Sequence, residues 1–229
     1  MELIEALRTT GAIRAYAEQP VSDEVLWRIL DTARFAPNGG NAQSWRVVVV
    51  RDQAIRARLQ ELHQRGWHSY VSMRHAGLRP WSPINDPADE RRAVAAAPAD
   101  LAAPPAPSPG VTEGIDGAPV VLALLADLSG LAAVDRDLDR YTYVGGASVY
   151  PFAWSVLLAA HDEGLGGVLT TMSVHEEAAV LDLLGAAPPL TLAAVLTLGY
   201  PVHRPRRLTR NAVETFTTLD RLDGTPFTR

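Results

Sequence analysis

The side chains best suited to binding a small molecule are two amides and a set of late arginines. Asn41 and Gln43 lie two positions apart in the stretch 36–45, which follows an expected helix. One side-chain amide offers both a donor and an acceptor, so the pair suits a planar heterocycle with both kinds of group along one edge. Gly39 and Gly40 would let the backbone approach such a ring closely.

A second segment combines small residues with hydroxyls. Gly166 and Gly167 begin an expected strand, and Thr170 and Thr171 end it. Glycines permit close approach of a flat ligand, and hydroxyls can donate to its edge. A flavin ring has these requirements.

The third segment is basic. Arg206 and Arg207 follow Gly199-Tyr200-Pro201, and a phosphate dianion is well bound by two or three guanidinium groups. Taken singly, the three segments also fit a helix-capping loop, a buried strand and a solvated tail. Together they favour a phosphorylated flavin.

Missing residue types exclude other chemistry. The chain has no cysteine and no lysine, so all 21 basic residues are arginine. Disulfides, thiolate nucleophiles, cysteine-ligated metals, Schiff-base lysines and a phosphate-loop lysine are therefore excluded. The formal net charge of −5 argues against a nucleic-acid partner. No histidine spacing indicates a metal, and no triad or carboxylate pair indicates a catalytic side chain. His63, His68 and His75 are expected to be solvated.

Hydrophobic periodicity predicts helices alternating with strands, which is an α/β or α+β pattern. The expected helices span 2–10, 22 to Pro37, 53–76, 146–163 and 175–184, and the expected strands span 47–50, 120–125, 165–171 and 192–198. The chain is expected to form one domain over 1–229. A proline-rich segment at about 80–119 interrupts it and is expected to be mostly irregular, as a cover or loop.

Neither the first residues nor any apolar run predicts membrane targeting. The N-terminus lacks the basic start and apolar core of a signal peptide. The longest apolar run, 118–126, is about half the length of a membrane helix. We expect a cytoplasmic protein with no membrane partner.

At these residues the sequence resembles the nitroreductase family of FMN-dependent oxidoreductases. The resemblance covers most of the chain outside the proline-rich segment. Four motifs carry it in family order: Thr9-Thr10-Gly11-Ala12-Ile13-Arg14 with Pro20-Val21, the stretch from Ala36 to Trp45, Gly164-Leu165-Gly166, and Leu198-Gly199-Tyr200-Pro201 with Arg206-Arg207.

The resemblance implies an α+β fold with a central, mostly antiparallel sheet flanked by helices. It also implies an intertwined homodimer with FMN at the interface. Carried over, Arg14, Arg206 and Arg207 hold the phosphate, and Asn41 and Gln43 meet the ring. Gly166, Gly167, Thr170 and Thr171 lie beside the ring near its reactive N5.

Two departures from the family pattern stand out. Gly11-Ala12 replaces the usual Arg-Ser, which removes a charge and a hydroxyl from the phosphate site, and Ser44 replaces a proline.

The resemblance implies an FMN-dependent NAD(P)H oxidoreductase working by a ping-pong cycle. NADH or NADPH would be the donor, and a nitroaromatic, quinone or activated alkene the acceptor. Trp67, Tyr70 and Trp81 with the proline-rich cover are candidates for an apolar acceptor pocket, or for ordinary packing. Two alternatives remain: another flavin reaction (dehalogenation, dehydrogenation or flavin cleavage), and a non-enzymatic or degenerate flavin binder.

Overall fold

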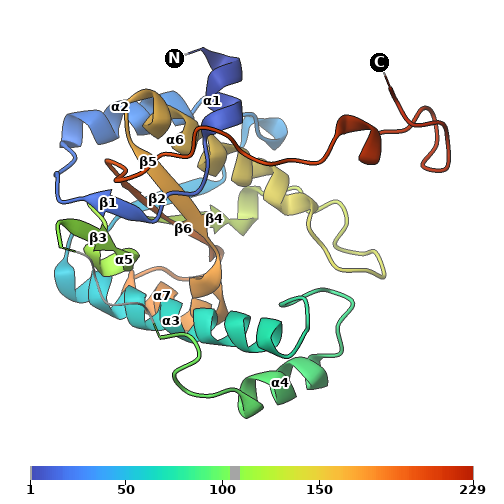
Figure 1. Cartoon of the computed structure of the whole chain (residues 1–229), viewed down its shortest axis with the longest axis horizontal. Coiled ribbons are helices and arrows are strands. Elements are labelled where there is room, and N and C mark those ends of the chain that lie inside the picture. Colours follow the sequence, from blue (N-terminus) through green and yellow to red (C-terminus); the bar gives the residue numbers. More distant parts are fainter. Residues whose placement is uncertain (1, 104–108, 229) are drawn as a thin grey trace.

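A four-stranded antiparallel sheet lies between two layers of helices (Figure 1). The computed structural model describes residues 2–103 and 109–228. The strand order is β2-β4-β6-β5, and the bounds are β2 Trp45–Val49, β4 Val120–Asp127, β5 Gly166–Thr170 and β6 Leu190–Gly199. A second, two-stranded sheet pairs β1 (Ala15–Ala17) with β3 (Val111–Glu113). The expected α+β class with an antiparallel sheet is confirmed.

The helices divide between the two faces of the sheet. Their bounds are α1 Leu3–Thr9, α2 Asp23–Ala33, α3 Gln53–His75, α4 Pro87–Ala96, α5 Gly114–Gly117, α6 Tyr150–Asp162 and α7 Glu177–Leu183. Helices α2 and α6 pack on one face, with α1 against α6. Helices α3, α5 and α7 pack on the other, with α4 outside α3 (Figure 1).

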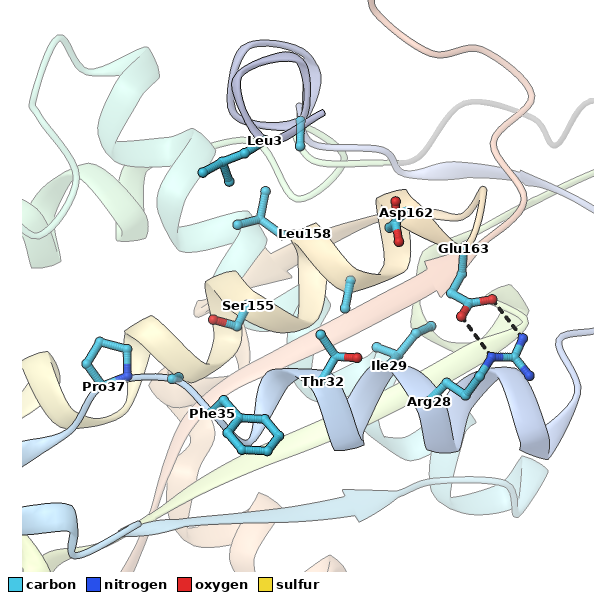
Figure 2. A pocket seen from close by; sticks show the side chains of 13 residues that line it. Leu3, Arg28, Ile29, Thr32, Phe35, Pro37, Ser155, Leu158, Asp162 and Glu163 are labelled. Atoms are coloured by element: carbon cyan, nitrogen blue, oxygen red, sulfur yellow. Dashed lines mark hydrogen bonds and ion pairs between the residues drawn. The ribbon is translucent and has the colours of Figure 1, made fainter. Parts of the chain in front are cut away.

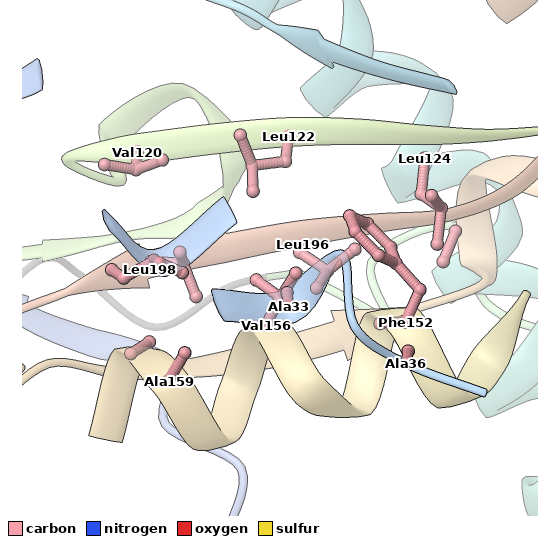
Figure 3. Packing of buried hydrophobic residues seen from close by; sticks show 14 of the residues in the cluster. Ala33, Ala36, Val120, Leu122, Leu124, Phe152, Val156, Ala159, Leu196 and Leu198 are labelled. Atoms are coloured by element: carbon pink, nitrogen blue, oxygen red, sulfur yellow. The ribbon is translucent and has the colours of Figure 1, made fainter. Parts of the chain in front are cut away.

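Strand β4 supplies the core on both faces. Successive side chains of a strand point to opposite sides, so Leu122 and Leu124 join the cluster under α2 and α6, where Phe152 and Val156 meet them (Figure 3). Val121 and Leu125 join the opposite cluster. Because both faces are covered, β4 has a nearly continuous apolar sequence instead of an alternating one.

Helix starts follow local capping chemistry. At α2, the Ser22 hydroxyl accepts from the Val25 amide at 3.3 Å. At α3, an Asp52 carboxylate oxygen accepts from the amides of Ala54 and Ile55 at 2.9 and 3.0 Å. Such caps satisfy amides that have no partner within the helix.

The proline-rich segment contains more structure than expected. Helix α4 forms there because Pro87 occupies its first turn, where proline is tolerated, and Asp86 accepts from the Ala88 amide at 2.8 Å. The expectation of irregular structure was therefore wrong over 87–96. Strands β1 and β3, three residues each, were too short for a periodicity argument. Pro104, Pro105 and Pro107 lie outside the described residues.

Candidate functional site

The segment that leads into β1, together with β1 itself, lies beside the start of β5 and the end of β6. The Ile13 amide donates to the Gly167 carbonyl, and the Ala17 amide donates to the Tyr200 carbonyl, both at 2.9 Å. Arg14 lies between these two contacts and has an exposed side chain. The structure therefore brings Arg14 next to the glycines of β5.

Tyr16 anchors this segment, and sequence reasoning missed it. Its ring is fully buried, and its hydroxyl lies 2.7 Å from both the Ile13 carbonyl oxygen and Thr197 Oγ1. Burial raises the pKa of the phenol to about 12. A buried hydroxyl is stable there only because these partners satisfy it, so Tyr16 fixes the backbone that carries Arg14.

The basic stretch 205–208 packs against the segment that precedes β1. A Cβ atom on Gly11 would lie 3.0 Å from Leu208 Cδ2 and 3.2 Å from Pro205 Cγ. The stretch 205–208, which includes Arg206 and Arg207, therefore packs against Gly11. A larger residue at position 11 would press on this stretch.

The three guanidinium groups predicted to bind phosphate are available to an anion. Within residues 2–103 and 109–228, Arg14, Arg206 and Arg207 make no hydrogen bond or ion pair, and all three are exposed. Arg204 differs, because it donates to the carbonyls of Gly164 and Leu165 at 3.1 and 2.8 Å. Arg204 thus holds the turn between α6 and β5.

The two glycines of β5 are required by packing within the chain. A Cβ on Gly166 would lie 2.6 Å from Ile13 Cγ1, and one on Gly167 would lie 2.5 Å from Leu198 Cδ2. Both distances are far below van der Waals contact, so these positions admit only glycine without local shifts. Contact of Gly166 and Gly167 with a ligand stays a prediction.

The chain that directly follows the hydroxyl pair of β5 packs on α3. Thr170 is half-buried and Thr171 is exposed. The short 3-10 helix η4, Met172–Glu176, follows and packs on α3 so closely that a Cβ on Gly66 would lie 2.1 Å from the Met172 carbonyl oxygen. Gly66 therefore sets the position of the chain directly after the threonines.

The loop that carries Asn41 and Gln43 has an unusual backbone. Asn41 and Gln43 have φ values of 54° and 49°, a left-handed conformation that costs free energy for residues other than glycine. The Asn38 side-chain oxygen stabilises the loop by accepting from the Gln43 amide at 2.9 Å. Both predicted amide side chains are exposed.

Within one chain, this loop lies apart from the other predicted residues. Trp45, which begins β2, pairs with Ala126 at one end of the sheet, whereas Gly166 pairs with Gly199 at the other. Strands β2 and β5 are also opposite edges, separated by three strand spacings or about 14 Å. The contacts within one chain therefore bring Arg14 beside Gly166 and Gly167 and pack the stretch with the late arginines against Gly11, whereas Asn41 and Gln43 lie toward the opposite edge and end of the sheet.

His63 is a polar residue whose role the sequence did not reveal. It was expected to be solvated, which is wrong: burial and the nearby Arg14 charge lower the pKa of its imidazole to about 4. Its Nδ1 atom is buried and has no hydrogen-bond partner among the described residues. The side of α3 that carries His63 is covered because α3 packs against η4, and the sequence gives no sign of this contact.

An aromatic series runs from α3 to η4. Ring centroids are 5.4 Å apart for Trp67 and Tyr70, 6.3 Å for Tyr70 and Trp81, and 5.7 Å for Trp81 and His175. Trp81 has a φ of 48°, which is rare for a bulky residue. These contacts hold the start of the proline-rich cover close to the chain that follows Thr171.

A separate groove of about 430 Å³ lies between α1, α2 and α6 (Figure 2). Leu3, Phe35 and Leu158 contribute apolar side chains to it. At one end Arg28 makes a two-point ion pair with Glu163, both N–O distances being 2.8 Å.

Two further properties concern metals and membranes. Over 2–103 and 109–228, no three histidine or acidic side chains are grouped as metal ligands. In the same ranges, no helix combines the length and apolar character needed to cross a bilayer.

The sequence profile of the nitroreductase family matches residues 7–200. This match covers most of the chain, and the observed fold agrees with it. The chain therefore belongs to the nitroreductase family.

Relatives agree on the family but differ in activity. An iodotyrosine deiodinase of Thermotoga neapolitana is 25% identical over 196 residues, 86% of each chain. An NADH dehydrogenase of Thermus thermophilus is 46% identical over 50 residues, 22% of this chain and 24% of that protein. Relatives with 32–46% identity align over only 34%, 35% and 24% of their own length.

Solved structures share the fold. The NADPH:FMN oxidoreductase from Vibrio harveyi, complexed with NAD+, has a TM-score of 0.63 at 19% identity, covering 95% of this chain and 76% of that chain.

Proposed function

We propose that this protein is an FMN-dependent NAD(P)H oxidoreductase that transfers hydride to an electron-poor small molecule. The observation that carries the proposal is that Arg14 lies beside Gly167 at the start of β5, and that the stretch with Arg206 and Arg207 packs against Gly11, three residues before Arg14. Exposed guanidinium groups without protein partners suit a phosphate. Threonine hydroxyls at the end of β5 suit a polar ring edge.

Bound FMN supplies the redox chemistry, accepting hydride from NADH or NADPH and passing it to the acceptor. The chain's own part is binding and orientation. Arg206 and Arg207 hold the phosphate, and Arg14 places a positive charge beside Gly167. Thr170 and Thr171 direct hydroxyls toward the ring, and the contact between Gly66 and Met172 keeps these hydroxyls in place.

The acceptor pocket is proposed to lie under the aromatic series. Trp67 and Trp81 are about two-fifths exposed, at 39% and 38%. Their electron-rich faces suit an electron-poor aromatic or quinone ring. Because Trp81 also contacts His175, the cover stays close to the chain after Thr171. It can therefore limit the entry of water.

We further propose that the site is completed by a second copy of this chain. Asn41 and Gln43 can meet the same ring as Arg14 only if a partner supplies them, because they lie apart within one chain. The groove and its surroundings expose Leu3, Trp27 and Phe35, at 66%, 65% and 73%. Large exposed apolar side chains grouped in this way mark an interface.

The C-terminal segment supports the same arrangement. Beyond residue 208 it runs out from the body of the protein (Figure 1) and exposes Phe216 and Leu222. An intertwined homodimer would bury these side chains on the partner.

The likeness to iodotyrosine deiodinase over 86% of both chains favours a second candidate, reductive dehalogenation of an aromatic substrate. It would use the same flavin site with a different acceptor.

An absorption spectrum tests the cofactor. The purified protein is mixed with excess FMN, desalted, and then treated anaerobically with NADH or NADPH. A retained flavin band that either nucleotide bleaches is expected. A retained band that neither nucleotide bleaches would contradict the donor and favour the alternative reactions, and a colourless protein would refute FMN binding.

Mixing two defective variants tests the shared site. Asn41→Ala and Arg206→Gln each weaken FMN binding on opposite parts of the site. In a mixed dimer, one site receives the native arginine from one chain and the native amide from the other. Mixing after reversible dissociation is therefore expected to restore tight FMN sites. A site built from a single chain would show no recovery, and light scattering reports the dimer directly.

A further inference from the structure

His161, in the last turn of α6, is hydrogen-bonded to a residue that lies far away in the sequence. Its side chain is buried, with 8% exposure, and its Nδ1 atom lies 2.6 Å from Thr10 Oγ1. This distance is that of a hydrogen bond. Thr10 directly precedes Gly11, so the bond fixes the end of α1 where the segment that leads to Arg14 begins.

The last turn of α6 also contacts the late basic segment. The His161 carbonyl oxygen accepts from the Gly164 amide at 3.0 Å. The Gly164 carbonyl oxygen in turn accepts from the Arg204 guanidinium at 3.1 Å. Arg204 is followed directly by Pro205, which packs against Gly11. The contacts therefore run from α6 through the late segment and back to the segment that follows α1.

Burial anchors the chain on either side of Thr10 but not at Thr10 itself. Within α1, Ala6 is buried, and the next buried residue along the chain is Ile13, whereas Thr10 is half-buried. The bond to His161 holds the chain between these two anchors. Loss of this bond should therefore loosen the segment and its packing against the stretch 205–208.

The His161 imidazole is mostly neutral at pH 7. Burial lowers its pKa, and the positive charge of Arg204 lowers it further, against the opposing charges of Glu5 and Asp162. The imidazole thus adds little charge of its own to the proposed phosphate site. Because it is also buried, it can influence that site only through the position of Thr10 and of the turn after α6.

We propose that His161 is a positioning residue for the phosphate site. Its bond to Thr10 holds the segment with Arg14 at a fixed distance from the stretch with Arg206 and Arg207. The three guanidinium groups are then placed to bind one phosphate, and the chain prefers FMN to riboflavin. Groups that are already in position bind more tightly, because less ordering is needed on binding. This inference rests on the proposed FMN function and adds a residue that supports its phosphate site.

The test removes the hydrogen bond from each side. His161→Phe keeps a ring without polar atoms, and Thr10→Val keeps the branched shape without the hydroxyl. Dissociation constants for FMN and for riboflavin, which has the same ring without the phosphate, come from flavin fluorescence. His161→Asn and Thr10→Ser each retain a polar atom. The matched control is Thr9→Val, because the Thr9 hydroxyl donates to the Glu5 carbonyl oxygen within α1 at 2.7 Å.

Loss of one hydrogen bond is expected to weaken FMN binding roughly fivefold in His161→Phe and in Thr10→Val. Riboflavin binding should stay unchanged, because the phosphate site is not used. The double variant should lose little more FMN affinity than either single variant, since both substitutions remove the same bond. The two polar variants should recover part of the loss, and Thr9→Val should bind both flavins like native protein.

Native FMN affinity in Thr10→Val would overturn the inference while leaving the FMN proposal intact. Equal losses for FMN and riboflavin would show a general structural effect and also overturn it, as would losses that multiply in the double variant. If His161→Phe does not fold, Thr10→Val and Thr10→Ser decide the question. Failure of native protein to bind either flavin would overturn the proposed function together with the inference.

Discussion

Replacing Gly66 by alanine should destabilise the protein, although helix propensity predicts the opposite. In the interior of a helix, alanine is favoured over glycine by about 1 kcal/mol. At Gly66, however, the new Cβ would lie 2.1 Å from the Met172 carbonyl oxygen, and the contacting atom belongs to the backbone. Either α3 or η4 must therefore shift.

The magnitude follows from these two effects. Overpacking costs up to about 3 kcal/mol, and subtracting the propensity gain of about 1 kcal/mol leaves a net loss of roughly 2 kcal/mol. For a chain of this size, each 1 kcal/mol lowers the melting temperature by roughly 2–4 °C. Gly66→Ala should therefore melt roughly 4–8 °C below native protein.

Calorimetry on the apoprotein measures this change, and Gly117→Ala is the matched control. Gly117 also lies in a helix, but its added Cβ would meet Thr112 Cβ at an ordinary 3.6 Å. The control should melt at or above the native temperature. An unchanged or higher melting temperature in Gly66→Ala would refute the close contact between α3 and η4.

Three further predictions concern single side chains. The Tyr16 phenol has a pKa of about 12 in the folded chain, against an ordinary value of 10.0. As pH rises, the unfolded chain therefore loses this proton first, and the free energy of unfolding falls between these two pH values. In urea titrations, Tyr16→Phe should remove this pH dependence and cost about 1–2 kcal/mol at neutral pH. The His63 imidazole has a pKa of about 4 in the folded chain, against an ordinary value of 6.5. On acidification the unfolded chain therefore binds a proton first, and stability is lost as pH falls from 6.5 toward 4. His63→Leu should reduce this loss, and an unchanged loss would show that another group causes it. Arg206→Gln with Arg207→Gln should weaken FMN by roughly tenfold or more and leave riboflavin binding unchanged, whereas equal losses for both flavins would contradict phosphate binding.

The fold could be predicted from the sequence wherever burial leaves a repeating pattern. Strand β4 and helix α3 have long apolar or amphipathic stretches with clear ends, and their positions agree with the structure. Strand β1 has three residues and helix α4 lies among prolines, so neither has a pattern long enough to recognise. Their stability comes from contacts with distant segments and from the Asp86 cap.

The candidate site could be predicted only in part. Motif order indicated Arg14, Gly167 and Arg206, and the fold places Arg14 beside Gly167 and packs the stretch with Arg206 against Gly11. It could not show that Gly166 serves packing against Ile13, because that contact joins segments far apart in the sequence. The burial of His63 Nδ1 was missed for the same reason, since a single histidine on a polar helix gives no sign of what covers it.

The strand order also determines when the sheet can form during synthesis. Strand β5 lies at the edge of the four-stranded sheet next to β6, and β6 fills the position between β4 and β5. Because β6 spans Leu190–Gly199, a ribosome-bound chain keeps one apolar edge of β4 unpaired until these residues have been made. Open strand edges favour aggregation, so truncations before Leu190 should be captured by chaperones, whereas truncations after the sheet is closed should not.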